Sequence, residues 1–143
     1  MFSIPKHGWV NISIGDWSDR SSYLTDPHLD TLDALIQFFR NNTPTAIHCD
    51  AEGWEYLIVF NWYEIFVIEQ KDENKLFSFD INVRDFANEV IKDIEEHLYD
   101  WSLWSYSVSE EKDRKDAENE IKSKLDELKL VLSDWDMRHK RVK

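Results

Sequence analysis

The stretch Ala51–Gln70, AEGWEYLIVFNWYEIFVIEQ, decides the fold of this chain. It contains two runs of β-branched and aromatic residues on either side of Asn61–Trp62, a pattern that predicts two antiparallel strands, 54–60 and 63–70, joined by a tight turn. Large apolar side chains occur at both odd and even positions, although an antiparallel sheet with one solvated face needs them on one side only. The sequence therefore raises the question of what covers the second face.

Pairing across two successive hairpins assigns each side chain to a face. We expect Phe60 to lie opposite Tyr63 in the first hairpin and Val67 to lie beside Phe79 in the second, because side chains alternate between the faces of a strand. The face that forms the core, beneath the first two helices, then collects Trp54, Tyr56, Ile58, Phe60, Tyr63, Ile65, Val67, Phe77, Phe79 and Ile81. The opposite face collects Leu57, Val59, Phe66 and Ile68, bordered by Glu55, Glu64, Gln70, Ser78, Asp80 and Asn82.

Two covers for this second face are consistent with the sequence. Fully burying each of its four apolar side chains contributes roughly 1.5–3 kcal/mol, so a cover is favourable. We favour the C-terminal helix folded back over the patch, because its stripe of Leu125, Leu128, Leu132 and Trp135 otherwise has nothing to bury. The alternative cover is a protein partner, since an apolar centre with an acidic rim has the composition of a recognition site.

The remaining elements surround this ribbon and define the fold class. In chain order the sequence predicts a strand at 9–14, a loop at 15–26, a helix at 27–40, strands at 45–49, 54–60, 63–70 and 76–83, a helix at about 86–101 and a last helix from about 109. Three successive tight connections imply an antiparallel meander. The class is therefore α+β: four to five strands, two helices on one face of the sheet and a long C-terminal amphipathic helix.

The formal net charge of −12 is unevenly distributed along the 143 residues. Residues 1–108 hold 19 acidic and 7 basic side chains, whereas residues 109–143 hold 10 of each. We therefore divide the chain into an acidic α+β domain, 1–108, and a charged amphipathic helix, 109–143, packed on the same domain. An acidic domain repels nucleic acid and anionic membranes and attracts a basic protein.

The sequence carries no motif of an enzyme or of a metal site. Its five histidines and its one cysteine lack the spacing of metal ligands, and its three glycines form no phosphate-binding loop. Cys49 has no partner for an internal disulfide, which is typical of a reducing cytoplasm. No run approaches the ~18 apolar residues of a membrane-spanning helix. We expect no catalytic residue, no metal, no cofactor and a cytoplasmic location.

Acidic and aromatic side chains gather near two predicted turns. Trp17 stands close to two aspartates, which makes it a candidate for an exposed contact, because tryptophan is enriched at binding hot spots. Trp54 follows the turn at 51–53. The partner-binding residues that we expect are Asp16, Trp17, Asp19, Asp50, Glu52, Trp54 and Glu55. We expect the chain to be a monomer or a weak dimer. A second hypothesis is a structural module that associates with itself or with another protein through its C-terminal helix.

The segments TDPHLDTLDALIQFF and DAEGWEYLIVFNWYEIFVI lie within a stretch from about Gly8 to Val83 that resembles the immunity proteins of bacterial polymorphic-toxin and contact-dependent growth inhibition systems. The resemblance is one of pattern: a loop, a helix opened by a Thr or Ser cap, and a meander of strands with a tight turn. It implies a small, acidic, cytoplasmic α+β protein that neutralises a cognate toxin domain by stoichiometric binding. It transfers no site residue.

Overall fold

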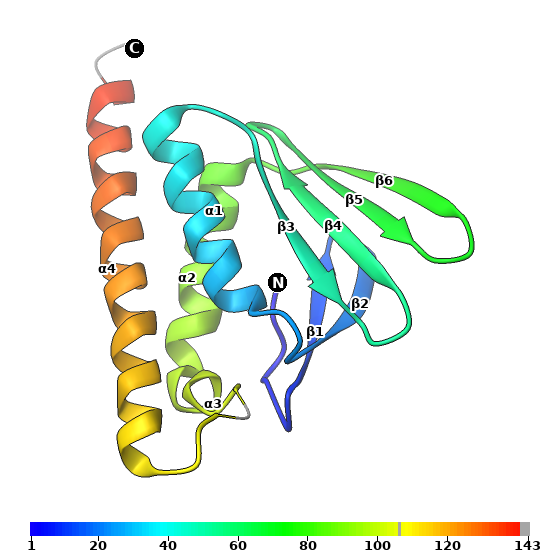
Figure 1. The fold of residues 1–143 in the computed structure, drawn as a ribbon. Coiled ribbons are helices and arrows are strands. Elements are labelled where there is room, and N and C mark those ends of the chain that lie inside the picture. The colour runs from blue at the N-terminus through cyan, green and yellow to red at the C-terminus, as the bar shows by residue number, and fades with distance from the viewer. Residues whose placement is uncertain (106, 141–143) are drawn as a thin grey trace.

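The computed structural model describes residues 1–105 and 107–140 and confirms the α+β class. In chain order its elements are β1 (Trp9–Ile14), β2 (Trp17–Ser22), α1 (Pro27–Asn41), β3 (Thr45–Asp50), β4 (Glu55–Phe60), β5 (Glu64–Gln70), β6 (Asn74–Asp80), α2 (Val83–Glu96), α3 (Leu98–Ser102) and α4 (Glu111–Lys140). Strands β3 to β6 form an antiparallel meander in sequence order, and β1 pairs with β2 in a separate hairpin. Helices α1 and α2 lie between this meander and α4 (Figure 1).

The predicted assignment of faces is correct, although both predicted hairpin registers are wrong by two residues. Phe60 pairs with Ile65 rather than with Tyr63, and the β5–β6 pairing is offset from the expected one by the same amount. The turn is accordingly longer than expected, with the backbone N–H of Asn61 donating to the carbonyl of Glu64 at 3.0 Å. An offset of two residues keeps each side chain on its face, because side chains repeat with a period of two along a strand. Tyr63 is the exception, since it lies in the loop and is 74% exposed.

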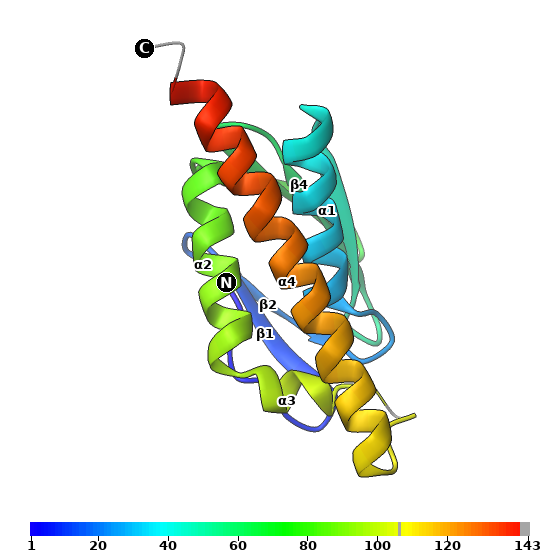
Figure 2. The same cartoon turned by 90° about the vertical axis from the view of Figure 1, so that its left-hand side faces the viewer.

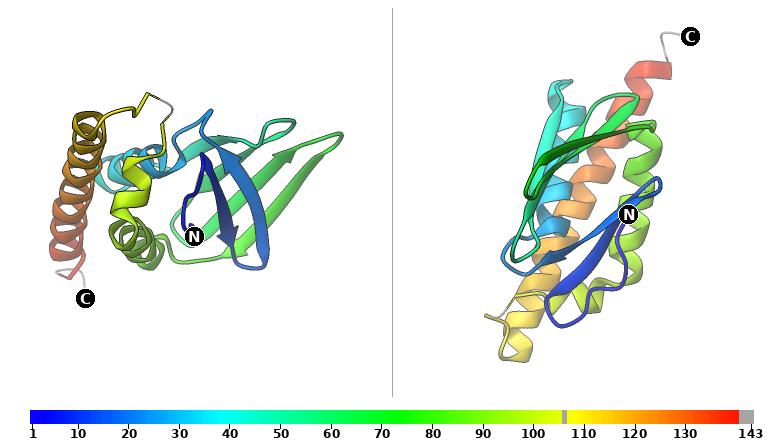
Figure 3. Two further views of the ribbon diagram at one scale, coloured as in Figure 1. Left: turned by 90° about the horizontal axis from the view of Figure 1, so that it is seen from below. Right: turned by 90° about the vertical axis from the view of Figure 1, so that its right-hand side faces the viewer.

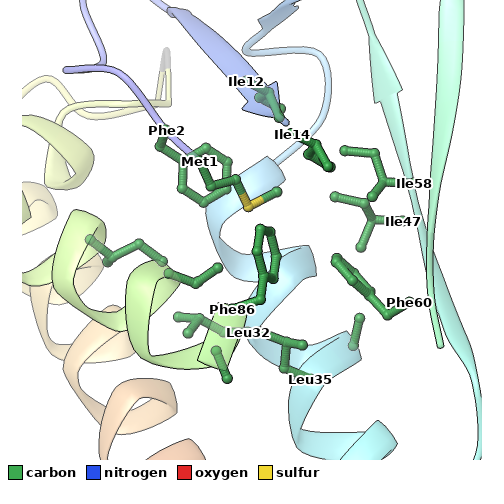
Figure 4. Packing of buried hydrophobic residues seen from close by; sticks show 14 of the residues in the cluster. Met1, Phe2, Ile12, Ile14, Leu32, Leu35, Ile47, Ile58, Phe60 and Phe86 are labelled. Atoms are coloured by element: carbon green, nitrogen blue, oxygen red, sulfur yellow. The ribbon is translucent and has the colours of Figure 1, made fainter. Parts of the chain in front are cut away.

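The core lies between the inner face of the sheet and the first two helices. The inward side chains of β4 and β5, apart from Glu69, are apolar or aromatic and completely buried. Leu32 and Leu35 from α1 and Phe86 from α2 pack against them, with the rings of Phe60 and Phe86 5.9 Å apart (Figure 4). This burial of apolar area is the main stabilising term of the fold.

The β1–β2 hairpin covers the rest of the inner face. The segment predicted as a loop at 15–26 contains strand β2, whose sequence WSDRSS lacks the alternation of apolar residues from which a strand is recognised. Trp17 nevertheless packs edge-on against Tyr56, with the ring centroids 5.1 Å apart. Gly15, at φ +58°, lies so close to Phe79 that a Cβ atom there would be 2.7 Å from the Phe79 ring.

The predicted second helix is divided into two. Helix α2 ends at Glu96 and α3 begins at Leu98, with His97 outside helical geometry at φ −124°. The predicted strand at 76–83 is also shorter, since β6 ends at Asp80 and Val83 already begins α2. Asn82, which we expected on the border of the outer face, caps α2 by accepting a hydrogen bond from the backbone of Asp85 at 3.2 Å.

Helix α4 does not cover the second face of the sheet, so that expectation is wrong. It lies across α1 and α2, on the side of these helices away from the strands (Figure 2). Its stripe of Leu125, Leu128 and Leu132 is buried there. The helix was expected to include residues 141–143, which lie outside the described residues. Ion pairs that tie α4 to α1 and α2 are Arg40–Glu127, Lys124–Asp33, Lys129–Glu95 and Arg84–Asp136.

Candidate functional site

The outer face of the β3–β6 sheet is not covered by another element of the described chain. Figure 3, on the left, shows helices α1, α2 and α4 on one side of the meander and β1–β2 below it, with the opposite face open. Leu57, Val59, Phe66 and Ile68 are all only partly buried, as their outward orientation requires. Leu76 on the neighbouring strand is 68% exposed. We call this surface the open face.

The strand register arranges the side chains of the open face in rows that cross the sheet. Two central rows are mainly apolar and two outer rows are polar or acidic. From one end to the other the rows are Asp50, Glu55, Gln70 and Asn74; His48, Leu57, Ile68 and Leu76; Ala46, Val59, Phe66 and Ser78; and finally Glu64 and Asp80.

The charge of the open face is negative at both ends. Asp50 and Glu55 stand at the β3–β4 end, and Glu64 and Asp80 stand at the opposite corner on β5 and β6. Lysine and arginine are absent from the outward positions of these four strands, all of which lie within the described residues. At these outward positions, the only side chain that can carry a positive charge is that of His48. Its Nε2 atom lies 2.9 Å from a carboxylate oxygen of Glu55. The face thus combines an apolar centre with carboxylates at its two ends and with neither lysine nor arginine at its outward positions.

The prediction that Trp17 forms an exposed contact is wrong. Its side chain is 7% exposed and points into the core, where its indole N–H donates to Glu69 at 3.2 Å. The tryptophan is therefore part of the packing between the β1–β2 hairpin and the sheet. Its position beside two aspartates in the sequence gave no indication of this, because β2 itself was not recognised as a strand.

Asp19 and Trp54 are brought together, but within a neutralised cluster. The indole N–H of Trp54 donates to Asp19 at 2.8 Å, and the ammonium group of Lys71 lies 3.5 Å from the same carboxylate. The guanidinium carbon of Arg20 and the Lys71 ammonium nitrogen lie 4.6 and 5.0 Å from the centre of the Trp54 ring. Such a set of charge-assisted and cation–π contacts stabilises the junction of β2 with β4. It leaves Asp19 little capacity for a partner.

The other four predicted residues lie in two separate turns and on the open face. Asp16 is exposed in the β1–β2 turn, and Glu52 is exposed in the β3–β4 turn at φ +56°. Asp50 and Glu55 belong to the open face, where one oxygen of Asp50 accepts from the backbone N–H of Glu52 at 2.7 Å. The sequence reasoning placed Ser78 and Asp80 of β6 on the border of this face but missed Leu76 and the contribution of β3, such as His48. Extending the alternation of odd and even positions to both edge strands would have found them.

A pocket of about 430 Å³ lies between the beginning of α1, α3 and the first half of α4. Its wall consists of core side chains on one side and of polar side chains of α4 on the other. His28 in its wall stacks on Trp101 with ring centroids 4.2 Å apart. Burial lowers the pKa of this histidine to about 3, so the ring is too weak a base to take up a proton near neutral pH. Asp113 in the same pocket accepts hydrogen bonds from the backbone at Ser109 and Glu110 and thereby caps α4.

Within the described ranges, no three His, Cys, Asp or Glu side chains are placed to hold a metal ion, and no helix has the length and hydrophobicity to cross a bilayer. Comparison with models of protein families, with curated proteins and with solved structures gives no match for this chain. The functional interpretation therefore rests on the geometry and charge of the open face.

Proposed function

We propose that this chain is a non-enzymatic inhibitor that neutralises a basic protein by equimolar binding on the open face of its sheet. The most specific form of the proposal is a bacterial, cytoplasmic immunity protein whose partner is a cognate toxin domain. The observation that carries it is the apolar centre of the open face, at Leu57, Val59, Phe66 and Ile68, together with carboxylates at both ends that face no lysine or arginine at the outward strand positions.

The physical roles of the two kinds of side chain are different. The carboxylates attract a basic partner over a distance and accelerate the encounter, an effect that salt weakens. The apolar rows then lose their remaining contact with water, which slows dissociation. A toxin that acts on a phosphate-containing substrate carries a basic surface of its own, and a bound acidic protein occupies that surface in place of the substrate.

The alternative of association through the C-terminal helix is less well supported. The stripe that was expected to mediate it is the one that α4 buries against α1 and α2, with Leu128 completely inaccessible. A second chain could use this stripe only if α4 first left its own domain. The open face needs no such rearrangement.

The test is a binding and neutralisation experiment with the protein encoded directly upstream of this gene. The full-length chain is immobilised, and its affinity for that protein is measured from low to high salt, in parallel with the toxicity of the protein in cells that do or do not express the chain. We expect equimolar binding that weakens as salt is added, and protection of the cells.

A pair of variants with the same change in net charge separates the open face from general acidity. Glu64→Gln with Asp80→Asn removes one charged end of the face, whereas Asp116→Asn with Asp126→Asn removes two exposed carboxylates of α4, away from it. The first pair should weaken binding and the second should not. Absence of binding, or an affinity that salt and both pairs leave unchanged, contradicts the proposal.

A further inference from the structure

We infer that the element that docks on the open face is an amphipathic α-helix of the partner, with basic residues about four helical turns apart and apolar residues between them. This inference rests on the proposed function and adds to it the shape and the spacing of the binding element. It follows from the distance between the two acidic ends of the face and from the spacing between its two apolar rows.

The distance between the acidic ends follows from the register. Asp50 and Glu55 are separated from Glu64 and Asp80 by six residues along the strands and by two strand spacings across them. With about 3.3 Å per residue and about 4.8 Å per strand, the diagonal between the two ends is about 22 Å. A helix rises 1.5 Å per residue, so about 15 residues span this diagonal. Because 3.6 residues make one turn, residues 14 or 15 positions apart point to the same side of a helix.

The apolar rows fit the same helix. The row of Leu57 and Ile68 lies two residues along the strand from the row of Val59 and Phe66, a distance of about 7 Å. Side chains at positions i and i+4 of a helix are about 6 Å apart along its axis, so one apolar pair of the partner matches the two rows. The apolar residues therefore occupy the middle two turns, and lysine or arginine stands beyond them at each end.

A helix is favoured over a strand as the docking element because the backbone groups of the central strands are already hydrogen-bonded. The N–H and C=O groups of β4 and β5 are used in pairing within the sheet, so the open face itself offers side chains and no backbone ladder. A helix satisfies its own backbone groups and covers a sheet with its apolar stripe, as α1 does on the inner face. An added strand would instead pair with the free edge of β6 and leave Phe66 uncovered.

A second copy of this chain is disfavoured as the occupant by charge. Two open faces in contact would bring four carboxylates of one copy against four of the other, with neither lysine nor arginine at the outward strand positions to compensate them. Like charges in an interface are unfavourable. The charge of the face therefore selects a basic partner.

The experiment uses the full-length chain labelled with ¹⁵N and a designed helical peptide of about 20 residues. This peptide has two arginines at each end of one face, about 15 residues apart, and leucines at i, i+3, i+4 and i+7 in its centre. A control peptide of the same composition has its arginines grouped in the middle of the opposite face. We expect the designed peptide to bind at least about tenfold more tightly than the control, with chemical-shift changes on β3 to β6.

Variants then test the role of each part. Glu64→Gln with Asp80→Asn should weaken binding of the peptide about tenfold, and Phe66→Ser should weaken it by at least as much. Asp116→Asn with Asp126→Asn, on α4, should leave it unchanged. The inference is overturned if neither peptide binds, if both bind equally, if the shift changes map only to the edge of β6, or if the chain dimerises through this face. If the upstream protein is still neutralised, and Glu64→Gln with Asp80→Asn still weakens its binding, the proposed function stands and only the helical binding element is rejected. Dimerisation through this face would contradict both.

Discussion

Substituting two isoleucines of one strand, one at a time, tests whether the two faces of the sheet differ in burial. Ile65 and Ile68 both lie in β5, three positions apart, and therefore point to opposite sides of the sheet. Ile65 is completely buried between the sheet and the helices, whereas Ile68 is partly exposed on the open face. The same change, isoleucine to alanine, can be made at both positions, so the lower strand propensity of alanine affects them alike.

The expected magnitudes follow from burial. Ile65→Ala removes three buried carbon atoms and leaves a cavity, which costs about 2–5 kcal/mol of the free energy of unfolding. Ile68→Ala removes the same atoms from a site where water already has access and where no closed cavity forms, so its cost is about 1 kcal/mol or less. For a chain of this size each kcal/mol lowers the midpoint of thermal unfolding by about 4 °C. Ile65→Ala should therefore lower the midpoint by about 8–20 °C, and Ile68→Ala by about 4 °C or less.

Urea denaturation followed by far-ultraviolet circular dichroism measures both free energies, and differential scanning calorimetry measures the midpoints. Equal destabilisation by the two substitutions, or a larger effect of Ile68→Ala, would refute the reasoning, because it would mean that the second face is covered as fully as the first. The comparison of free energies requires the same denaturant slope in both variants, because a changed slope means a change in the compactness of the denatured state or a departure from two-state unfolding.

Three further predictions concern the titration and reactivity of single groups. The wild-type chain should lose more stability between pH 6.5 and pH 4 than the His28→Phe variant. The reason is that the histidine takes up a proton in this range when the chain is unfolded, whereas burial lowers the pKa of the folded ring to about 3 and keeps it neutral. Urea titrations at several pH values measure the difference. Asp136→Asn should lower the free energy of unfolding by about 0.5 kcal/mol at pH 7 and leave it unchanged at pH 2. The hydrogen bond from Arg84 lowers the pKa of the Asp136 carboxyl, and the stabilisation disappears once the carboxyl is protonated. A large difference between the two chains at pH 2 would contradict this. Burial raises the pKa of the Cys49 thiol to about 12, so a maleimide should label this cysteine only after denaturation, and rapid labelling of the native chain, followed by mass spectrometry, would disprove its burial.

The assignment of faces could be predicted from the sequence although the pairing could not. The turn at Asn61 was expected to contain two residues, but the chain takes a longer loop in which Tyr63 is exposed. Apart from Tyr63, this error did not affect the inner and outer sets, since the offset was an even number of residues. The physical reason is that alternation encodes which face is apolar, whereas turn length depends on local backbone conformations that a sequence without glycine at the turn specifies weakly.

Strand β2 and the position of α4 could not be predicted for different reasons. The sequence of β2 is polar, and its strand conformation depends on pairing with β1 and on the burial of Trp17 against Tyr56, which are both tertiary effects. The apolar stripe of α4 indicates that one side is buried but does not identify the surface that buries it. Its charged neighbours do so in the structure, for example Lys124, which forms a 2.6 Å ion pair with Asp33 of α1.

Of the predicted contact residues, those on the sheet were the easiest to place. Asp50 and Glu55 follow from the alternation of β3 and β4, and both lie on the open face. Trp17 and Asp19 depend on the unrecognised β2, and both turn out to be engaged within the domain. Enrichment of tryptophan at binding sites was therefore a weaker guide than strand alternation, because a buried tryptophan has the same local sequence as an exposed one.

The central claim is that one face of the β3–β6 sheet is buried by the helices and by the β1–β2 hairpin while the other is exposed to solvent. Solvent paramagnetic relaxation enhancement, with methyl-labelled full-length chain and a soluble gadolinium chelate, measures this directly. We expect strong broadening of the methyl signals of Leu57, Val59 and Ile68 and little broadening of those of Ile58 and Ile65. Equal protection of the two sets would contradict the account, since it would show that the open face is covered within the chain itself.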